Sequence, residues 1–433
     1  MANKCKTEKE LNEYSSPFNV NNQLYFCGVP FRMDSYNGCE HGCTYCFVRS
    51  AELTSHSRKN RNGIAHGGNI MVPETKDVQR VLVNALDTNE KRADINIEWL
   101  RHRMPIHWGG MSDPFQPCER KFGVSKQWMK YLNWYEYPVV FSTKATLMAF
   151  DKEYLQLLRE GKYAAQVSLI TDDADFIRQL EPGAPSPEDR MKALAIMADA
   201  GIWTAVRMQP IIPDSVVEWK MPEFVEKMAK IGVKHIVAEG YKVPVRNPVG
   251  METIWKLAPQ AKFEYDYSDT NNEGFERLLP ARRKWKYYKL LLEVCHANGM
   301  TLGAADNDMR DLGDTVCCCG TDNIPGFENY WKYQASMAAK IAKEKGYVFL
   351  EDMQQFWTGG DKEFSVHNDL LKNSGKPTTP QWCVDFFWDR GGANSPECID
   401  SMKKVTIDGK LAYQWTDRIP VWEAQDTKQE RMF

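Results

Sequence analysis

The stretch YPVVFSTKATLMAFDKEYLQLLREGKYAAQVSLIT, Tyr137 to Thr171, contains the repeat that decides the fold. It begins with a β-rich apolar run, 137–145, and ends with a second one, 163–171. Between them, residues 151–161 have the pattern of a helix with an aspartate cap and a glycine stop. Two strands joined by one helix and short links predict a parallel βαβ unit.

The same alternation continues on both sides of this stretch. Further strands are expected at 104–110, 204–212 and 235–243. Further helices are expected at 124–135, 186–201 and 221–232, the second of them capped by Ser186. At least six strand–helix units fit between about residue 30 and residue 310. The sequence therefore predicts an α/β fold, a partial or complete (βα) barrel with its chemistry at the carboxyl ends of the strands.

The rhythm of strands and helices also predicts the domain organisation. Residues 1–30 are expected to be an N-terminal extension, 31–310 the barrel, and 311–433 an irregular C-terminal extension that wraps the barrel. An insertion at about 244–280 interrupts the barrel pattern and is too long for a plain connector. It is either a loop that covers the substrate or a surface excursion.

Composition excludes several classes of protein. The chain has 433 residues, of which 43% are hydrophobic, and a net charge of −3, so it is neither disordered nor built as a whole to hold nucleic acid, although a local basic groove is compatible with these numbers. The first residues have no apolar core typical of a signal peptide, and no apolar run approaches about 18 residues. We expect a cytoplasmic protein without a membrane span. Its 12 cysteines are then metal ligands or redox groups rather than a disulfide framework.

Three of these cysteines lie in YNGCEHGCTYCFVRS, residues 36–50: Cys39, Cys43 and Cys46. Thiolates are soft ligands that suit iron–sulfur clusters and zinc. A structural zinc site normally has a fourth ligand, and His41 lies inside the loop between two thiols. The spacing therefore favours a [4Fe–4S] cluster with one open iron over zinc or inert thiols.

The octapeptide CEHGCTYC resembles the C-x₃-C-x₂-C signature of radical S-adenosylmethionine (SAM) enzymes, including the aromatic Tyr45 before the last cysteine. The stretches HWGGMSDPFQPCERKFGVS, FSTKATLMAFDKEYLQLL and VRMQPIIP, with residues 166–202, resemble the branch that includes spore photoproduct lyase. The resemblance covers roughly residues 30 to 215. It implies that SAM binds the open iron through its amino and carboxylate groups.

The resemblance also implies SAM contacts in the cysteine loop and at the ends of the predicted strands: Tyr45, Phe47 through its backbone, Gly109, Gly110, Ser112, Lys144 and Ser168. Lys144 can neutralise a carboxylate, and the serines can hydrogen-bond the ribose or the carboxylate. The implied reaction is reductive cleavage of SAM to a 5′-deoxyadenosyl radical that removes a substrate hydrogen, with an electron donor such as flavodoxin or ferredoxin. Spore photoproduct lyase has a cysteine hydrogen donor where this chain has Met111, which argues against photoproduct repair.

A second group of cysteines lies in GDTVCCCGTDN. In a strand, Cys317 and Cys319 would share one face. They are candidates for a second site, an auxiliary cluster or zinc, together with Cys383 and Cys398. Alternatively, Cys317, Cys318 or Cys319 donates a hydrogen atom or an electron to a substrate radical, or all are buried structural thiols.

The substrate is less constrained. The segment 282–289 interleaves basic and aromatic residues, which suits a nucleic-acid backbone, but Trp285, Tyr288 and Leu292 have the spacing of a core stripe. A nucleobase or nucleotide in DNA, modified or rearranged, competes with a peptide or a small metabolite. A function of another class is an iron–sulfur electron-transfer or binding protein without SAM turnover.

Overall fold

The computed structural model describes residues 18–20, 24–48, 70, 72–73, 76–87, 95–244, 250–265, 276–358, 384–385, 388–389 and 395–430. The central sheet has eight strands in the order β1-β2-β3-β4-β5-β6-β7-β10. Their bounds are Phe18–Val20 (β1), Phe31–Met33 (β2), Ile106–Trp108 (β3), Val139–Thr143 (β4), Tyr163–Ser168 (β5), Trp203–Ile211 (β6), His235–Gly240 (β7) and Thr301–Ala304 (β10).

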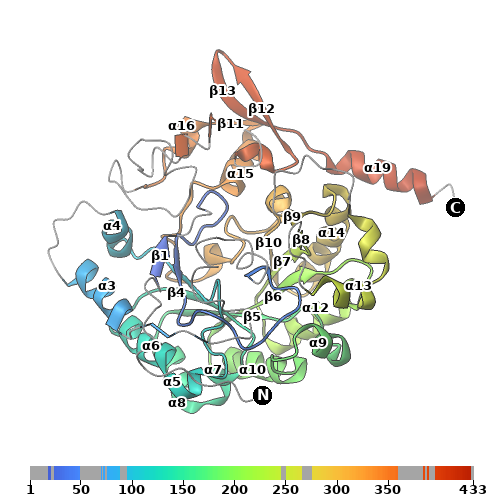
Figure 1. The fold of residues 1–433 in the computed structure, drawn as a ribbon. Coiled ribbons are helices and arrows are strands. Elements are labelled where there is room, and N and C mark those ends of the chain that lie inside the picture. The colour runs from blue at the N-terminus through green and yellow to red at the C-terminus, as the bar shows by residue number, and fades with distance from the viewer. Residues whose placement is uncertain are drawn as a thin grey trace.

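In this sheet, strands β2 to β7 and β10 pair in parallel, and β1 pairs antiparallel with β2. Within the described residues the edge strands β1 and β10 do not pair with each other, so the α/β barrel is partial. Helices surround the outside of this sheet (Figure 1). The predicted fold class is thereby confirmed, in its partial form.

The outer helices follow the strands as the sequence predicts. Those between β3 and β10 are α5 (Glu119–Phe122), α6 (Val124–Trp134), α7 (Leu147–Phe150), α8 (Lys152–Glu160), α9 (Ala174–Leu180), α10 (Pro187–Asp199), α11 (Val216–Trp219), α12 (Met221–Ile231), α13 (Met251–Leu257) and α14 (Ala281–Ala297). Helices α3 (Lys76–Leu86) and α4 (Ile95–Arg101) precede β3. The Asp151 and Ser186 side chains accept hydrogen bonds from the first turns of α8 and α10, which confirms both predicted caps.

Alternation along the strands separates two faces of the sheet. In β4, Val139 and Phe141 belong to the large core beneath the helices, whereas Val140 belongs to a second cluster inside the barrel. Burying a side chain such as Phe141 contributes about 1.5–3 kcal/mol. The hydrophobic stabilisation therefore comes mainly from the helix-facing side, where the larger core lies.

The second cluster closes the barrel interior at the amino ends of the strands. It joins Val140 and Ala164, each the second residue of its strand, to Val316, Phe327 and Tyr330. Residues 316–330 thus act as a plug. Side chains nearer the carboxyl ends of the strands are left to form a separate layer above it.

The insertion at 244–280 contains α13, a 3-10 helix (Gln260–Glu264) and the short paired strands β8 (Val243–Pro244) and β9 (Glu276–Arg277). Its first helix begins against the cysteine loop, because a Cβ added to Gly250 would lie 2.1 Å from the carbonyl oxygen of Thr44. Of the two interpretations of the insertion, this contact favours a loop that covers the substrate and not a surface excursion.

Helix α14 carries the basic and aromatic segment. Trp285 and Tyr288 are buried, Leu292 packs against the same core, and the Lys284 ammonium lies 2.5 Å from Asp308. The core-stripe interpretation is confirmed, since buried rings are not available to stack with bases.

Beyond η3 (Asn307–Leu312), the C-terminal extension contains regular elements as well as turns. These are η4 (Thr321–Asn323), α15 (Ala335–Lys345), β11 (Tyr347–Phe349), α16 (Leu350–Met353), the 3-10 helix Pro396–Cys398, β12 (Met402–Ile407), β13 (Lys410–Trp415) and α19 (Ile419–Glu430). Strands β11, β13 and β12 form a small antiparallel sheet that projects from one side of the barrel (Figure 1). No helix among the described residues combines the length and apolar character needed to cross a membrane.

Candidate active site

The cysteine loop, Gly38 to Cys46, follows β2 at the carboxyl end of the parallel sheet. Cys39 and Cys43 are buried and Cys46 is half-buried. Gly38 and Gly42 have φ angles of 92° and 61°, a region that favours glycine, so the backbone can turn tightly around the first two thiols.

The three thiols lie within electrostatic reach of one another. Burial raises the pKa of Cys39, and negative charge on Asp113, Cys43 and Cys46 raises it further. Burial also raises the pKa of Cys43 to about 12, while the Lys144 ammonium acts in the opposite direction. A soft, closely spaced thiol set with one cation beside it fits an iron–sulfur cluster in chemistry.

In this conformation no three His, Cys, Asp or Glu side chains of the described residues are placed to hold a metal ion. The three thiols therefore match a cluster in kind and spacing but are not gathered around one point. Their assignment as cluster ligands stays a prediction.

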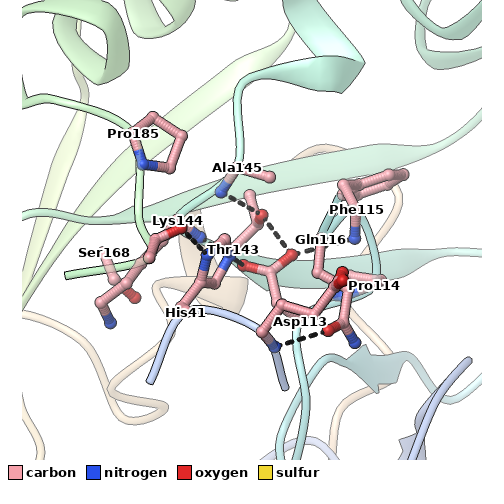
Figure 2. Close-up of polar contacts among 12 residues, drawn as sticks. His41, Asp113, Pro114, Phe115, Gln116, Thr143, Lys144, Ala145, Ser168 and Pro185 are labelled. Atoms are coloured by element: carbon pink, nitrogen blue, oxygen red, sulfur yellow. Dashed lines mark hydrogen bonds and ion pairs between the residues drawn. The ribbon is translucent and has the colours of Figure 1, made fainter. Parts of the chain in front are cut away.

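Asp113 fixes the cysteine loop to two strand ends (Figure 2). Its Oδ2 lies 2.9 Å from His41 Nε2 and accepts a hydrogen bond of 2.6 Å from the backbone N–H of Lys144. Its Oδ1 accepts from the Thr143 hydroxyl at 2.7 Å and from the Phe115 N–H at 2.9 Å. One buried carboxylate thus joins the loop after β2 to the ends of β3 and β4.

Two further contacts hold the same loop from either side. Gln116 accepts a hydrogen bond from the Glu40 N–H at 2.8 Å and donates to the Gly38 carbonyl at 3.1 Å. The Gly183 N–H donates to the His41 carbonyl at 2.9 Å, and a Cβ on Gly183 would lie 2.3 Å from the Glu40 carbonyl oxygen. The sequence 113–119, DPFQPCE, is thus a cradle for the cysteine loop.

A buried ion pair lies on the other side of the loop. Glu181 and Arg190 are both fully buried, with Arg190 Nη1 2.6 Å from Glu181 Oε2. The Tyr45 hydroxyl donates to the Glu181 carboxylate. Burial favours a raised pKa for Glu181, but the charges of Arg190 and Lys144 outweigh it and hold that pKa below its usual value. Arg190 also donates to the Ser168 carbonyl at 2.8 Å, which ties the end of β5 to this group.

The predicted SAM contacts differ in how far their side chains are exposed. Lys144 and Ser168 are half-buried at the ends of β4 and β5, and the Lys144 Nζ lies 5.4 Å from the centre of the Tyr45 ring. Ser112 is 7% exposed, and its hydroxyl donates to the Tyr36 carbonyl at 2.6 Å. Phe47 is 52% exposed.

Each of the two glycines in the predicted contact set has its own surroundings. Gly109 has a φ of 90°, and a Cβ there would lie 2.4 Å from the Ser142 carbonyl oxygen, so the neighbouring strand requires this glycine. A Cβ on Gly110 would meet only the Arg32 side chain, at 3.8 Å. The role of these residues in binding SAM stays a prediction.

The cysteine trio lies inside the barrel. Residues 313–319 form bends and turns, so a strand with alternating faces at Cys317–Cys319 is wrong. The reason is that the Asp322 carboxylate accepts from the Val316 and Cys317 N–H groups. A hydrogen bond from Cys319, and then the charges of Arg310 and Arg207, lower the pKa of Cys318 to about 6 against the effect of burial.

The predicted second metal site is not assembled among the described residues. Cys383 lies outside them. Cys317 and Cys398 both lie within electrostatic reach of the Arg310 guanidinium, as does Cys27, which the sequence interpretation missed. Four thiols, Cys318 included, therefore raise the pKa of one cation, and they form no metal site among the described residues.

The sequence interpretation also missed Asp113, Gln116, Glu181 and Arg190. A signal existed for the first two, because polar residues three apart directly follow a predicted strand in DPFQP. No local signal marks Glu181 and Arg190, which are joined to the site only by the folded chain.

No protein-family model matches the chain. An uncharacterized protein of Mycobacterium bovis is 27% identical over 188 residues, which are 43% of this chain and 51% of that protein. A radical SAM Nα-GlyT isomerase of Pseudomonas phage M6 is 24% identical over 208 residues, 48% of this chain and 38% of the isomerase. The chain thus spans about half the length, or less, of these curated relatives.

Two solved structures overlap with the fold. A spore photoproduct lyase variant with bound AdoMet and dinucleoside spore photoproduct has a TM-score of 0.46 and 15% identity, over 65% of this chain and 79% of that chain. Streptococcus suis SuiB bound to S-adenosylmethionine has a TM-score of 0.37 and 13% identity, over 64% and 58%. In its three-cysteine motif, and in sequence over about half of its length, the chain resembles the radical SAM proteins.

Proposed function

We propose that the chain is a radical SAM enzyme whose cluster ligands are Cys39, Cys43 and Cys46. The observation that supports this most is the cradle: a three-thiol loop is held by Asp113 and Gln116 against the ends of parallel strands. A plain electron carrier does not need such a ring of strand ends. When bound there, a [4Fe–4S] cluster supplies the electron that cleaves SAM to methionine and a 5′-deoxyadenosyl radical.

Lys144 is the residue that we assign to the SAM carboxylate. Burial favours a lowered pKa for this amine, but negative charge on Cys43 and Glu181 outweighs it and raises the pKa, so the ammonium stays protonated. The Tyr45 ring beneath it adds a cation–π contact. These contacts hold the cation in place before SAM arrives, which lowers the entropic cost of binding.

The remaining contacts position SAM. Ser168 lies at the end of β5, next to the strand end that Lys144 follows, while Ser112 keeps free lone pairs because it donates its own proton to the Tyr36 carbonyl. Tyr45 and the Phe47 backbone border the adenine. Together they orient the nucleoside half and keep water from the reacting carbon.

For the substrate we propose a nucleobase or nucleotide, by analogy with the relative named as an Nα-GlyT isomerase. A peptide or a small metabolite is the competing class. Photoproduct repair is excluded from the proposal because Met111 has no S–H to donate. A flavodoxin or ferredoxin would deliver the electron.

The test is anaerobic reconstitution with iron and sulfide, followed by SAM and dithionite, with 5′-deoxyadenosine measured in the presence of DNA, nucleosides or peptides. Cys43→Ala should lose the cluster absorbance and all 5′-deoxyadenosine. Cys295→Ala, which removes a buried thiol of α14, should keep both. An intact cluster that yields no 5′-deoxyadenosine with any substrate class would instead indicate an electron-transfer or binding protein.

A further inference from the structure

A hydrogen-bonded row of polar side chains crosses the barrel interior, one from each of four adjacent strands. His107 Nε2 lies 2.8 Å from the Ser142 hydroxyl, which donates to Gln166 Oε1 at 3.4 Å. Arg207 Nη1 donates to the same oxygen at 2.9 Å. We call His107, Ser142, Gln166 and Arg207, with Arg32 of β2, the polar belt. Barrels of this type usually fill the interior with branched apolar side chains, so a polar layer needs an explanation.

The polar belt lies between the plug and the predicted SAM contacts. Gln166 donates to the Cys319 carbonyl below it at 3.2 Å. Arg32 contacts the space beside Gly110 above it. Arg32 and Arg207 are only half-buried, and both alternate along their strands with residues of the helix-facing core, so they face the barrel interior.

A third arginine, Arg310 of η3, joins the two in the belt. Burial lowers the pKa of His107, and the charges of Arg207 and Arg32 lower it further, so both guanidinium groups act on one imidazole. Arg310 and Arg207 likewise act on one thiol, Cys318. The strand register agrees with this. Arg310 contacts the Ala305 carbonyl just after β10, and Ala304 of β10 pairs through Ala238 of β7 with Met208, the residue after Arg207.

None of these three arginines forms an ion pair with a carboxylate among the described residues. Arg207 donates to the amide oxygens of Gln166 and Gln209. Arg310 is 8% exposed and makes long contacts of 3.3–3.4 Å to Asn307 and the Ala305 carbonyl. It is also a hydrogen-bond partner of the Cys318 thiol. The Arg310 Nη1 and the Arg32 Nε are buried without a hydrogen-bond partner.

The nearby acids are committed elsewhere. Glu239 of β7 lies 2.5 Å from the Lys242 ammonium. Asp306 accepts from the Tyr287 and Tyr288 hydroxyls and from the Gly240 N–H. The Cys318 thiol, whose pKa is lowered to about 6, can balance one of the three positive charges. Excess buried positive charge is still costly, and proteins keep it where a ligand brings the opposite charge.

We infer that Arg32, Arg207 and Arg310 form an oxyanion site that holds a carboxylate or phosphate group of the substrate inside the barrel. Guanidinium groups suit both, because their planar donor sets match carboxylate and phosphate oxygens. This inference deepens the proposed function, and the identification of the bound anion as part of a substrate rests on that function. An anionic group anchored in the polar belt would leave the remainder of the molecule facing the SAM contacts above.

The test measures anion binding by the full chain without cluster or SAM, so it does not depend on radical chemistry. Inorganic phosphate and acetate are titrated separately by calorimetry, with chloride at matched ionic strength as the reference. We expect saturable millimolar binding of at least one probe, and the probe that binds identifies phosphate or carboxylate as the recognised group. Arg207→Gln and Arg310→Gln should each weaken it at least tenfold, whereas Arg178→Gln, on the exposed face of α9, should not.

Thermal unfolding of the same proteins separates a ligand site from a structural role. Because three guanidinium groups share one thiol of low pKa, each variant removes excess positive charge, and the ligand-free melting temperature should stay the same or rise. No saturable binding of either probe would overturn the inference. It would equally fail if Arg207→Gln and Arg310→Gln lowered the melting temperature and left anion binding intact. If SAM cleavage fails but anion binding behaves as expected, the proposed function is wrong and the oxyanion site remains.

Discussion

The imidazole of His41 and the carboxylate of Asp113 meet at 2.9 Å, and both side chains are buried. His41 lies between two of the three thiols, and Asp113 also binds the backbone of Lys144. The predicted cluster loop and the predicted SAM-binding lysine are thus held by one carboxylate. Their relative position is set before any cofactor binds.

Asp113→Asn should therefore loosen the loop even in the protein without iron. The amide places an N–H group against other donors, and the loss of charged hydrogen bonds should cost about 2 kcal/mol. Urea unfolding of the apoprotein measures this, and iron release to a chelator should accelerate in the reconstituted protein. Asp151→Asn is the control, because asparagine caps a helix as well as aspartate does. Equal behaviour of the two variants would contradict the role of Asp113.

Glu181→Gln should be among the most destabilising single changes in the site. It leaves the fully buried Arg190 without its counter-charge, which typically costs about 3–5 kcal/mol. Glu188→Gln breaks the exposed pair with Lys192 on the same helix and should change stability little, because solvent screens such a pair. Denaturant midpoints of the two variants give the comparison, and similar losses would show that burial of the pair is not what matters.

Gly250→Ala tests the contact between the insertion and the cysteine loop. The added Cβ would lie 2.1 Å from the Thr44 carbonyl oxygen at a φ of 83°. Gly326→Ala is a close control, since its φ is 84° and no atom lies within 4 Å of the added carbon. Gly250→Ala should therefore be less stable than Gly326→Ala by about 1–3 kcal/mol, the usual cost of overpacking. Of the two variants, only Gly250→Ala should release iron faster. If both variants lost the same stability and released iron at the same rate, backbone strain would explain both results.

The stability of the protein should fall between pH 4 and pH 7 through Asp311. Burial raises the pKa of this carboxyl to about 6 in the folded state, above an unfolded value near 3.9. The folded state therefore holds the proton more tightly, so the stabilising effect is complete below about pH 4 and is lost as pH rises through 6. Asparagine mimics the protonated acid at every pH. Asp311→Asn should match the wild type near pH 4 and exceed its unfolding free energy by roughly 2–3 kcal/mol at pH 7.

Asp352→Asn should change the unfolding free energy at pH 7 in the opposite direction to Asp311→Asn. Partial burial is outweighed by the hydrogen bond from Lys345 and by the Phe349 N–H, so the pKa of Asp352 is lowered and its ionised form stabilises the fold. The wild type should then be the more stable protein at pH 7 and lose that advantage as pH falls. Chemical unfolding at several pH values measures both variants, and a pH-independent difference for Asp311→Asn would refute a raised pKa.

Local signals were enough to predict the barrel. The caps at Asp151 and Ser186 and the apolar run of β4 depend on neighbours a few residues away, and the structure has them as expected. One local signal was overlooked. Asp408 and Gly409 both have positive φ between β12 and β13, the hairpin turn that an Asp-Gly pair favours, so this hairpin could have been predicted.

The cradle could not be predicted in this way because its contacts join distant parts of the chain. His41 is 142 residues from Gly183 and 72 from Asp113. Arg310, whose pKa the four thiols raise, is likewise 283 residues from Cys27. Residue type and spacing predict the candidate binding residues, whereas the residues that hold them in place depend on topology.

The polar belt also affects how homologous sequences should be compared. In evolution, a polar layer that reduces fold stability is retained only while the protein still binds the ligand that the layer serves. Without that function, substitutions would replace it with apolar side chains that fill the barrel better. Arg32, Arg207 and Arg310 should then be gained or lost together across relatives, independently of the three cysteines. A relative with the cysteines but without the arginines would have kept the chemistry and changed its substrate.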